Sequence, residues 1–445
     1  MPRVLSLGIA LSAYLALAGA AHAQSNIEAN QGVQLDFLNP GARSLAMGGA
    51  FIGLADDATA ALANPAGLRA LSRTEISYEH RIRQFHTPFV FSGRLSGTPS
   101  NSGVDTVSGP VFRTAETSRQ IPSFLSGVYA SAKHNWTVAG YRHETSRFFN
   151  TFRTGGPVFR NESGGNTRYF PIDAYIDLSL VNYGAAGSYK WQSCKTTNGV
   201  KTCQDRFAVG GGVSFYDYYM DSKTTRYDLP TSFFAAPVYT TPVNNQFQFG
   251  EQWKTGYNIG AMFIPSSRVQ VGVSYRQKVA FDTDVTNYVV ETGLLINPAD
   301  RSAEFVLPSN LGLGTSFRLT RSTVVALDYN FVRYSDSTQR FVNVFPSNTR
   351  EVATNYSAPD ANELHIGLEH QFVNAKIAPA LRVGTWFDPD HAVRHNTTLT
   401  SFLPGKDVWH VTAGGGVVIT KLEVNGALDF SDRGNIGSVS AVFRF

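Results

Sequence analysis

Two arginines in regular, strand-like segments are the first candidates for chemistry. Arg276 and Arg382 both fall on the polar side of an alternating apolar–polar pattern. A guanidinium on such a face binds the carboxylate of an amphipathic solute, or it pairs with acids on the same face, such as Asp328 or Glu369. The sequence leaves both interpretations open, so Arg276 and Arg382 are candidate ligand-binding residues.

The only two cysteines, Cys194 and Cys203, stand in the segment SCKTTNGVKTC. They flank Asn198-Gly199, a dipeptide typical of tight turns. Two cysteines without histidine partners are a weak signal for a metal site. We expect a local disulfide, formed in an oxidising compartment, and no metal.

Catalytic motifs are absent from the sequence. It contains no H-E-x-x-H, no G-x-S-x-G and no phosphate-binding glycine loop. The triple glycines at 210–212 and 414–416 fall inside strand-like segments and not at strand-to-helix turns. A lipid-modifying enzyme built into a barrel would need a Ser–His pair near one rim, and no spacing demands one. We therefore expect that the protein is not an enzyme and that it binds no cofactor.

The composition excludes other classes. Charged residues make up only 16% and aromatic residues 12% of the 445 residues, which speaks against disorder. The net charge is +4 and no block of five like charges occurs, which speaks against nucleic-acid binding.

The first residues have the form of a secretory signal. Arg3 precedes an apolar stretch, Val4 to Leu17, and Ala21-His22-Ala23 forms a small-residue cleavage site. A buried or membrane helix is the alternative, but the run is short for a span. We predict a signal peptide over residues 1–23. No stretch of 18 apolar residues follows it, so a membrane protein would have to cross with strands.

Most of the remaining chain alternates with a period of two. Segments such as 269–276, 325–331 and 421–430 place apolar residues on one face and polar residues on the other. A soluble β-sandwich is the alternative, but the segments are long and nearly all long connections fall on one side. The sequence thus predicts an all-β protein, a 14-stranded antiparallel transmembrane β-barrel. The predicted strands are 73–83, 121–132, 136–146, 172–190, 207–220, 247–263, 268–279, 304–318, 321–335, 361–374, 376–388, 406–419, 421–432 and 436–445. Only one connection on the short side is long, at 191–206.

Residues 24–72 do not alternate and are rich in small side chains. Asp56-Asp57 precede an Ala-rich stretch that they could cap as a helix, and Asn64-Pro65-Ala66-Gly67 ends it. We expect this segment to fold as an N-terminal hatch inside the lumen of a barrel that spans residues 73–445.

Several segments resemble the FadL/TodX family of outer-membrane transporters of hydrophobic compounds. Gly41–Asp57 followed by Asn64–Leu68 is similar to the family's hatch. Leu307–Gly312, leading to Tyr334-Ser335, resembles one of its hairpins, and Leu403–Asp407 followed by Gly414–Gly416 resembles its penultimate region. The hatch motif also occurs in related barrels of secretion systems.

The resemblance implies a fourteen-stranded barrel that admits a hydrophobic ligand from outside and releases it sideways, through a gap beside the third strand. Gly140 is then the candidate kink, and an ordinary strand glycine is the alternative. Asn64, Pro65 and Ala66 are candidate gating residues that fix the hatch shape near the gap; a plain helix stop is the alternative.

The sequence therefore predicts a passive transporter of long-chain fatty acids or aromatic hydrocarbons in the bacterial outer membrane. Its expected partners are the hydrophobic ligand and outer-membrane lipid with lipopolysaccharide, and we expect a monomer. The main alternative is a non-transporting barrel that serves as a scaffold or shuttle in protein secretion. An open aqueous porin is a further alternative, against which the hatch argues.

Overall fold

A computed structural model describes residues 30–445 except 31, 36, 132, 162, 198–199, 231–233, 291–293, 297–301, 339–342, 345–349, 352–355, 374–376 and 396–404. The predicted signal peptide, the Asn198-Gly199 turn and the Leu403-Pro404 motif lie outside the described residues. Among the described residues, no helix is long and apolar enough to cross a membrane.

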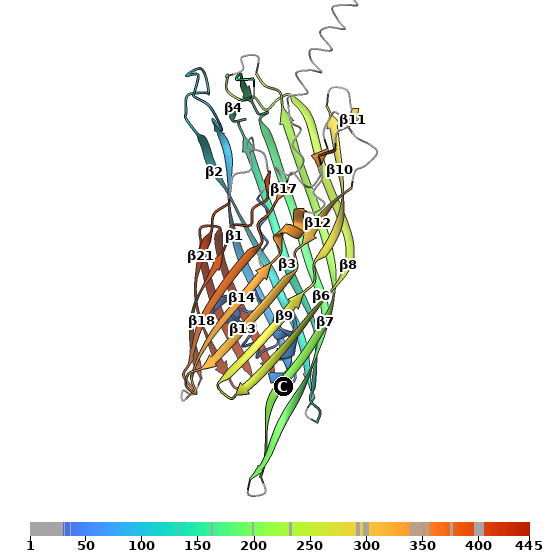
Figure 1. The fold of residues 1–445 in the computed structure, drawn as a ribbon, viewed down its shortest axis with the longest axis vertical. Coiled ribbons are helices and arrows are strands. Elements are labelled where there is room, and N and C mark those ends of the chain that lie inside the picture. Colours follow the sequence, from blue (N-terminus) through green and yellow to red (C-terminus); the bar gives the residue numbers. More distant parts are fainter. Residues whose placement is uncertain are drawn as a thin grey trace, which may run out of the picture.

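Antiparallel strands close into one ring with fourteen positions (Figure 1). Two positions are each shared by two segments in line, because β8 pairs with both β9 and β10, and these pair in turn with β13 and β12. The last strand pairs with the first, from Glu75 opposite Arg444 to Arg83 opposite Ile436, and so closes the barrel. The ring consists of β1 Glu75–Gly93, β2 Pro110–Ala130, β3 Trp136–Thr154, β6 Ile172–Thr197, β7 Val200–Tyr227, β8 Pro242–Ser266, β9 Val269–Arg276, β10 Val279–Val289, β12 Ser302–Leu307, β13 Asn310–Arg318, β14 Thr323–Val332, β18 Ala361–Gln371, β19 Pro379–Asp388, β21 Val408–Ile419, β22 Leu422–Ser431 and β23 Gly434–Arg444.

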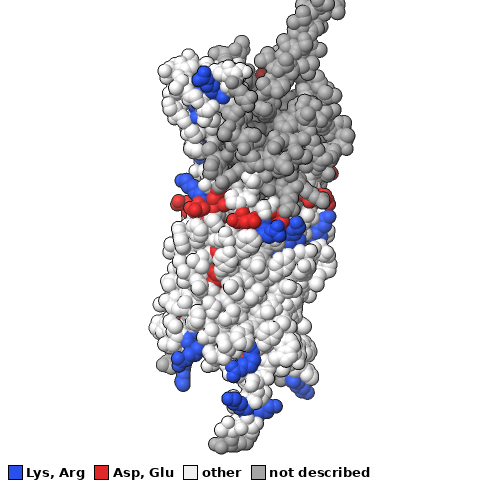
Figure 2. Space-filling view, viewed as in Figure 1, with Lys and Arg blue, Asp and Glu red and all other residues white. Residues whose placement is uncertain are grey.

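The alternation has the predicted orientation. On β14, Ala326 and Asp328 point inward and are fully buried, whereas Leu327 and Tyr329 point outward and are 39% and 42% exposed. The outer wall carries a broad, nearly uncharged band, bounded by a belt of acidic and basic side chains on one side and by lysines and arginines on the other (Figure 2). An apolar outer band and a polar inner face are the pattern of a transmembrane barrel.

The two ends of the barrel differ. At the short-turn end, most connections have few residues, such as 131–135, 267–268, 319–322 and 420–421. At the long-loop end, the first strands are taller than predicted, because β1 continues to Gly93, β3 to Thr154 and β7 to Tyr227 (Figure 1). Small strands lie in the long connections: β4 Val158–Arg160, β5 Asn166–Arg168, β11 Leu294–Ile296, β15 Asn343–Val344, β16 Arg350–Glu351, β17 Tyr356–Ser357 and β20 Arg394–His395, with a 3-10 helix, η2 Tyr334–Thr338.

One predicted loop is a strand pair. Residues 191–197 continue β6 and residues 200–206 continue β7, so the connection expected at 191–206 is a two-stranded ribbon. It projects beyond the short-turn end (Figure 1). The alternation could not reveal it, because a ribbon exposed on both faces has no apolar face to mark it.

The hatch segment runs inside the barrel near the short-turn end. It contains a short helix α3 (Ala42–Ala46), a helical turn α4 (Ala60–Ala63) and a 3-10 helix η1 (Pro65–Ala70). Its apolar residues, among them Phe51, Leu54 and Leu68, form one buried core with small inward residues of the wall, such as Ala186 and Ala326. Asp57 precedes α4 and accepts a hydrogen bond from the Thr59 N–H at 2.9 Å, while Asp56 pairs with Arg43.

Candidate functional site

Glycines on seven strands make room for the hatch. A Cβ on Gly260 would lie 2.0 Å from Asn64 Oδ1, and a Cβ on Gly384 would lie 2.3 Å from the backbone nitrogen of Gly48. At the two ends of this row, a Cβ on Gly210 of β7 would lie 2.3 Å from the Pro65 carbonyl carbon, and a Cβ on Gly414 of β21 would lie 2.7 Å from the Ala46 Cβ. The hatch therefore lies directly against the wall, on a glycine belt that consists of Gly210, Gly260, Gly272, Gly314, Gly367, Gly384 and Gly414.

Asn64 joins two parts of the hatch to the wall. Its side chain is fully buried. Nδ2 donates to the Ile52 carbonyl at 3.1 Å and to the Ala261 carbonyl of β8 at 3.4 Å, and Oδ1 accepts from the Ala66 N–H at 3.2 Å. Pro65 begins η1, where its missing N–H costs nothing. The residues do end α4, but Asn64 also makes long-range bonds that a plain helix stop does not need.

Asp328 holds the middle of the hatch. This buried carboxylate on β14 accepts hydrogen bonds from the backbone N–H groups of Phe51 at 2.5 Å and Ile52 at 2.6 Å. His365 on β18 adds a contact of 2.7 Å between its Nδ1 and the Gly48 carbonyl. Asp328 is thus a partner of the hatch backbone and not of a lumen arginine.

Arg382 belongs to the network that anchors the hatch. Its Nε lies 2.6 Å from Glu369 Oε2, and the same carboxylate binds Arg43 Nε of α3 at 2.8 Å. Arg43 also reaches Asp56 at 2.5 Å and Asp57 at 3.6 Å. Burial raises the pKa of the Asp57 carboxyl above its ordinary value, and the Arg43 charge opposes this shift. Since Arg382 is committed to Glu369, the structure supports the pairing alternative for this residue.

Arg276 has a different environment. It points inward from the end of β9, and among the described residues no acid forms an ion pair with it. Its guanidinium carbon lies 5.8 Å from the centre of the Phe37 ring, and its Nε is buried without a hydrogen-bond partner. The alternation thus placed Arg276 correctly, and the pairing with a lumen acid is not formed.

The interior above the hatch is apolar beside Arg276. Inward residues of β6, such as Leu178 and Leu180, are fully buried, and Tyr218 stacks on Phe281 at 4.4 Å between ring centres. At this level of β6 the expected orientation is therefore reversed, because the inward residues are apolar while Asp173, Asp177 and Ser179 lie on the outer face. The buried cluster comprises Phe37, Phe85, Phe148, Ile176, Leu178, Leu180, Tyr216, Tyr218, Met220, Val279, Phe281, Leu307, Val332, Tyr334, Ala358 and Ala361.

The backbone ladder between β2 and β3 is short. It runs only from Phe124 opposite His143 to Ala130 opposite Thr137, although both strands continue with their other neighbours to Pro110 and Thr154. Where the ladder stops, side chains bridge the strands: Arg142 Nη1 donates to the Pro122 carbonyl, and Thr117 Oγ1 donates to the Phe149 carbonyl at 2.8 Å. The backbone ladder is thus interrupted beside the third strand, and side-chain hydrogen bonds connect β2 and β3 there.

Gly140 is not at this break. It pairs on both sides, with Gly127 of β2 and Ala185 of β6, and a Cβ added to it would meet nothing within 4 Å. The irregularity in β3 is a register shift between Glu144 and Ser146. Pro122 is the residue that the sequence reasoning missed, although a proline inside a strand signals a missing ladder bond.

The two cysteines of the chain lie in the β6–β7 ribbon. Cys194 and Cys203 lie opposite each other in the β6–β7 ribbon and form a disulfide. Within the described part of the chain, no three His, Cys, Asp or Glu side chains gather in a way that could hold a metal ion.

Residues 198–430 match the family described as outer membrane protein transport protein (OMPP1/FadL/TodX). No curated protein sequence matches the chain. Among solved structures, a FadL homologue from Pseudomonas aeruginosa is 14% identical, with a TM-score of 0.61, over 93% of this chain and 99% of that chain. The toluene transporter TbuX from Ralstonia pickettii is 16% identical, with a TM-score of 0.54, over 92% of this chain and 99% of that chain. The toluene transporter TodX from P. putida is 15% identical, with a TM-score of 0.54, over 92% of this chain and 99% of that chain. At these identities, the structural likeness concerns the fold.

Proposed function

Because the chain belongs to the OMPP1/FadL/TodX family of outer-membrane transport proteins, we propose that it carries hydrophobic small molecules passively across the outer membrane. The short-turn end then faces the periplasm and the long loops face outward. The observation that carries the proposal is the apolar cluster above the hatch. A greasy solute can replace apolar side-chain contacts there, whereas water and ions find no polar path through it.

The ligand classes are long-chain fatty acids and aromatic hydrocarbons. Arg276 favours the first class, because a half-buried guanidinium that forms no ion pair among the described residues is suited to a carboxylate. The aromatic residues of the cluster suit the second class, and the structural neighbours TbuX and TodX are toluene transporters. A fatty acid that places its carboxylate at Arg276 and its apolar chain among Phe37, Tyr216 and Phe281 uses both features.

Release sideways into the membrane is part of the proposal. It is supported by the short β2–β3 ladder, since the side-chain bridges from Arg142 and Thr117 are easier to open than a continuous backbone ladder. The hatch, seated on the glycine belt and bound by Asn64 and Asp328, closes the direct route to the periplasm. In this role Asn64, Pro65 and Ala66 keep the hatch closed.

The test is uptake of a labelled long-chain fatty acid and of labelled toluene by cells with and without the protein. A variant that joins β2 to β3 by a disulfide, Thr117→Cys with Phe149→Cys, tests lateral release. Reduced uptake in the oxidised variant, restored by a reductant, supports it. Equal uptake under both conditions contradicts lateral release but leaves transport itself intact.

A further inference from the structure

The β6–β7 ribbon at the periplasmic end is the most unusual projection of the barrel. We call residues 191–197 and 200–206 the periplasmic ribbon. β3 accompanies β6 only to the pair of Trp136 and Tyr189, and β8 accompanies β7 only to the pair of Phe207 and Phe263. Beyond these pairs, both edges of the ribbon are open.

The open edges present backbone hydrogen-bonding groups. The Cα atoms of Cys194 and Cys203 are 4.0 Å apart, the close spacing of a pair that does not exchange backbone hydrogen bonds. The N–H and C=O groups of these residues therefore point away from each other, toward the two edges. Hydrogen-bonding directions repeat every second residue along a strand. The pair of Thr196 and Lys201, two residues nearer the tip, therefore also directs its N–H and C=O groups toward the edges. Such a row of groups is a template for an added strand.

The ribbon is held ready for such an addition. A two-stranded ribbon by itself is marginally stable in water, and the disulfide joins its strands near the middle. An edge that is already ordered costs a partner little entropy on binding.

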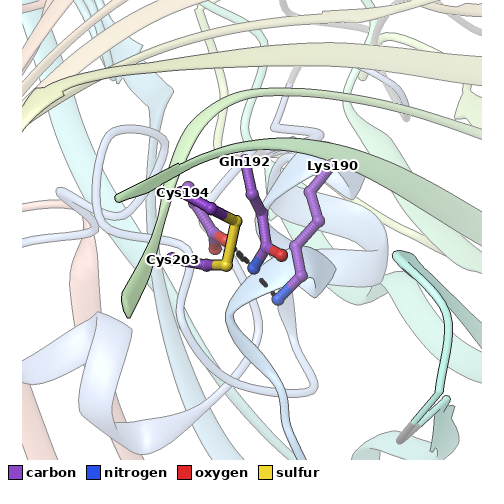
Figure 3. Close-up of a disulfide and its surroundings, with 5 residues drawn as sticks. Lys190, Gln192, Cys194 and Cys203 are labelled. Carbon is purple, nitrogen blue, oxygen red and sulfur yellow. Dashed lines mark hydrogen bonds and ion pairs between the residues drawn. A yellow bond between two sulfur atoms is a disulfide. The ribbon is translucent and has the colours of Figure 1, made fainter. Parts of the chain in front are cut away.

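Its base is tied to the hatch. Asp205 accepts hydrogen bonds from Arg69 Nη1 of η1 at 2.9 Å and from Gln192 Nε2 at 2.8 Å. Lys190 Nζ donates to the Arg69 carbonyl at 3.1 Å. Figure 3 shows Lys190 and Gln192 beside the disulfide. The base of the ribbon is thus bonded to η1, the last helical turn of the hatch before β1 begins.

The charge of the ribbon indicates the kind of partner. Lys195 and Lys201 lie on opposite faces, and neither has an acidic partner among the described residues. The only acid of the ribbon, Asp205, is already engaged by Arg69. Lysines on an open edge disfavour unspecific pairing with other strands and repel basic ones. They attract a strand that carries acidic side chains.

We propose that the periplasmic ribbon is a docking edge for an acidic, extended segment of a soluble periplasmic protein, which adds to it as a strand. This inference goes beyond ligand transport, and it is tested by binding alone, so its outcome does not depend on the transported ligand.

The test measures binding of a short fluorescent peptide of alternating Glu and Val to the purified, detergent-solubilised full-length protein. The probe should bind the unaltered protein, and the double variant Lys195→Glu/Lys201→Glu should bind it about tenfold more weakly or less. The matched control is Lys133→Glu/Lys421→Glu, which reverses two exposed lysines on other periplasmic turns and should leave binding unchanged. The same peptide with alternate amides N-methylated lacks the donors that a strand needs and should not bind.

Three results would overturn the proposal. The first is equal binding to both double variants, and the second is equal binding of the N-methylated peptide, which would reduce the interaction to charge alone. The third is that isolated peptidoglycan sacculi bind through Lys195 and Lys201 while the peptide does not, which would make the cell wall the partner. Both lysines are exposed and bear no structural bond, so the variants are expected to fold.

Discussion

The carboxylate of Asp328 on β14 lies 2.6 Å from the backbone nitrogen of Ile52, and it receives the neighbouring N–H of Phe51 as well. A wall residue therefore binds the backbone of the hatch, independent of the hatch side chains. A Cβ on the neighbouring Gly314 would lie 2.4 Å from the nitrogen of Gly53. The close contact at Gly314 and the hydrogen bonds to Asp328 therefore both hold this part of the hatch against the wall.

Asp328→Ala should loosen the hatch. It removes three hydrogen bonds to the carboxylate, from the N–H groups of Phe51, Ile52 and Gly53, and leaves these buried donors without that partner, a cost of about 3 kcal/mol or more. The measurement is trypsin cleavage at Arg43, which is largely buried while the hatch is seated. Cleavage should be clearly faster than in the unaltered protein. Asp282→Ala, which removes an exposed acid on β10, is the control and should not change the rate.

Gly384→Val should displace the hatch, because even a Cβ would lie 2.3 Å from the backbone of Gly48 and cannot be accommodated by a side-chain movement. Gly140→Val is the matched control, since it adds a side chain to open space on a strand of the same barrel. Trypsin cleavage at Arg43, which is largely buried while the hatch is seated, should become faster for Gly384→Val only. Faster cleavage for Gly140→Val as well would contradict the role given to the glycine belt.

Arg276→Leu should separate the two ligand classes. Loss of a charge-assisted hydrogen bond weakens carboxylate binding by at least about tenfold, so uptake of a long-chain fatty acid at low concentration should fall accordingly. Toluene uptake should not fall, because toluene has no group for the guanidinium. Arg153→Leu, at an exposed ion pair of the outer rim, is the control. If both solutes are affected equally, Arg276 has a structural role.

The outer loop after β1 should respond to acid. Hydrogen bonds from Arg94, at 2.8 and 2.7 Å, hold the pKa of the buried Asp105 carboxyl well below its ordinary value. The folded loop therefore binds fewer protons than the open loop, and the stabilisation is present at neutral pH and is lost as the pH falls through the ordinary value toward the depressed one. Proteolysis of the loop 94–109 should increase in acid, and Asp105→Asn should be cleaved readily at all pH values. An unaltered protein whose cleavage does not depend on pH would speak against this anchoring.

The sequence predicts the fold because the alternation of apolar and polar residues marks the outer and inner faces of most strands. Leu327 and Tyr329 face outward and Ala326 and Asp328 face inward, as the alternation indicates. The interior beside β6 and β7 broke this rule, since residues such as Leu178 and Leu180 serve an apolar lumen. The sequence of β6 does alternate here, but alternation alone does not tell which of its two faces points into the lumen.

The site was accessible only in part. Alternation placed Arg276 and Arg382 on the inner face, but the choice between ligand and salt bridge depended on whether Glu369 of the neighbouring strand was opposite, as it is for Arg382. The resemblance makes Gly140 the candidate kink, whereas the β2–β3 ladder ends at Phe124 and His143, next to Pro122 and the Glu144–Ser146 shift. Cross-strand register decides both questions, and a single sequence does not contain it.

The most direct test of the central claim is uptake of labelled fatty acid and toluene by cells that lack the protein, carry it, or carry it with Asn64-Pro65-Ala66 replaced by Gly-Ser-Gly. The account predicts protein-dependent uptake of at least one solute and a changed rate in the hatch variant, with equal amounts of barrel in the outer membrane. Absence of protein-dependent uptake for both solutes, with the barrel in place, would contradict transport of either class and favour a scaffold or shuttle in protein secretion.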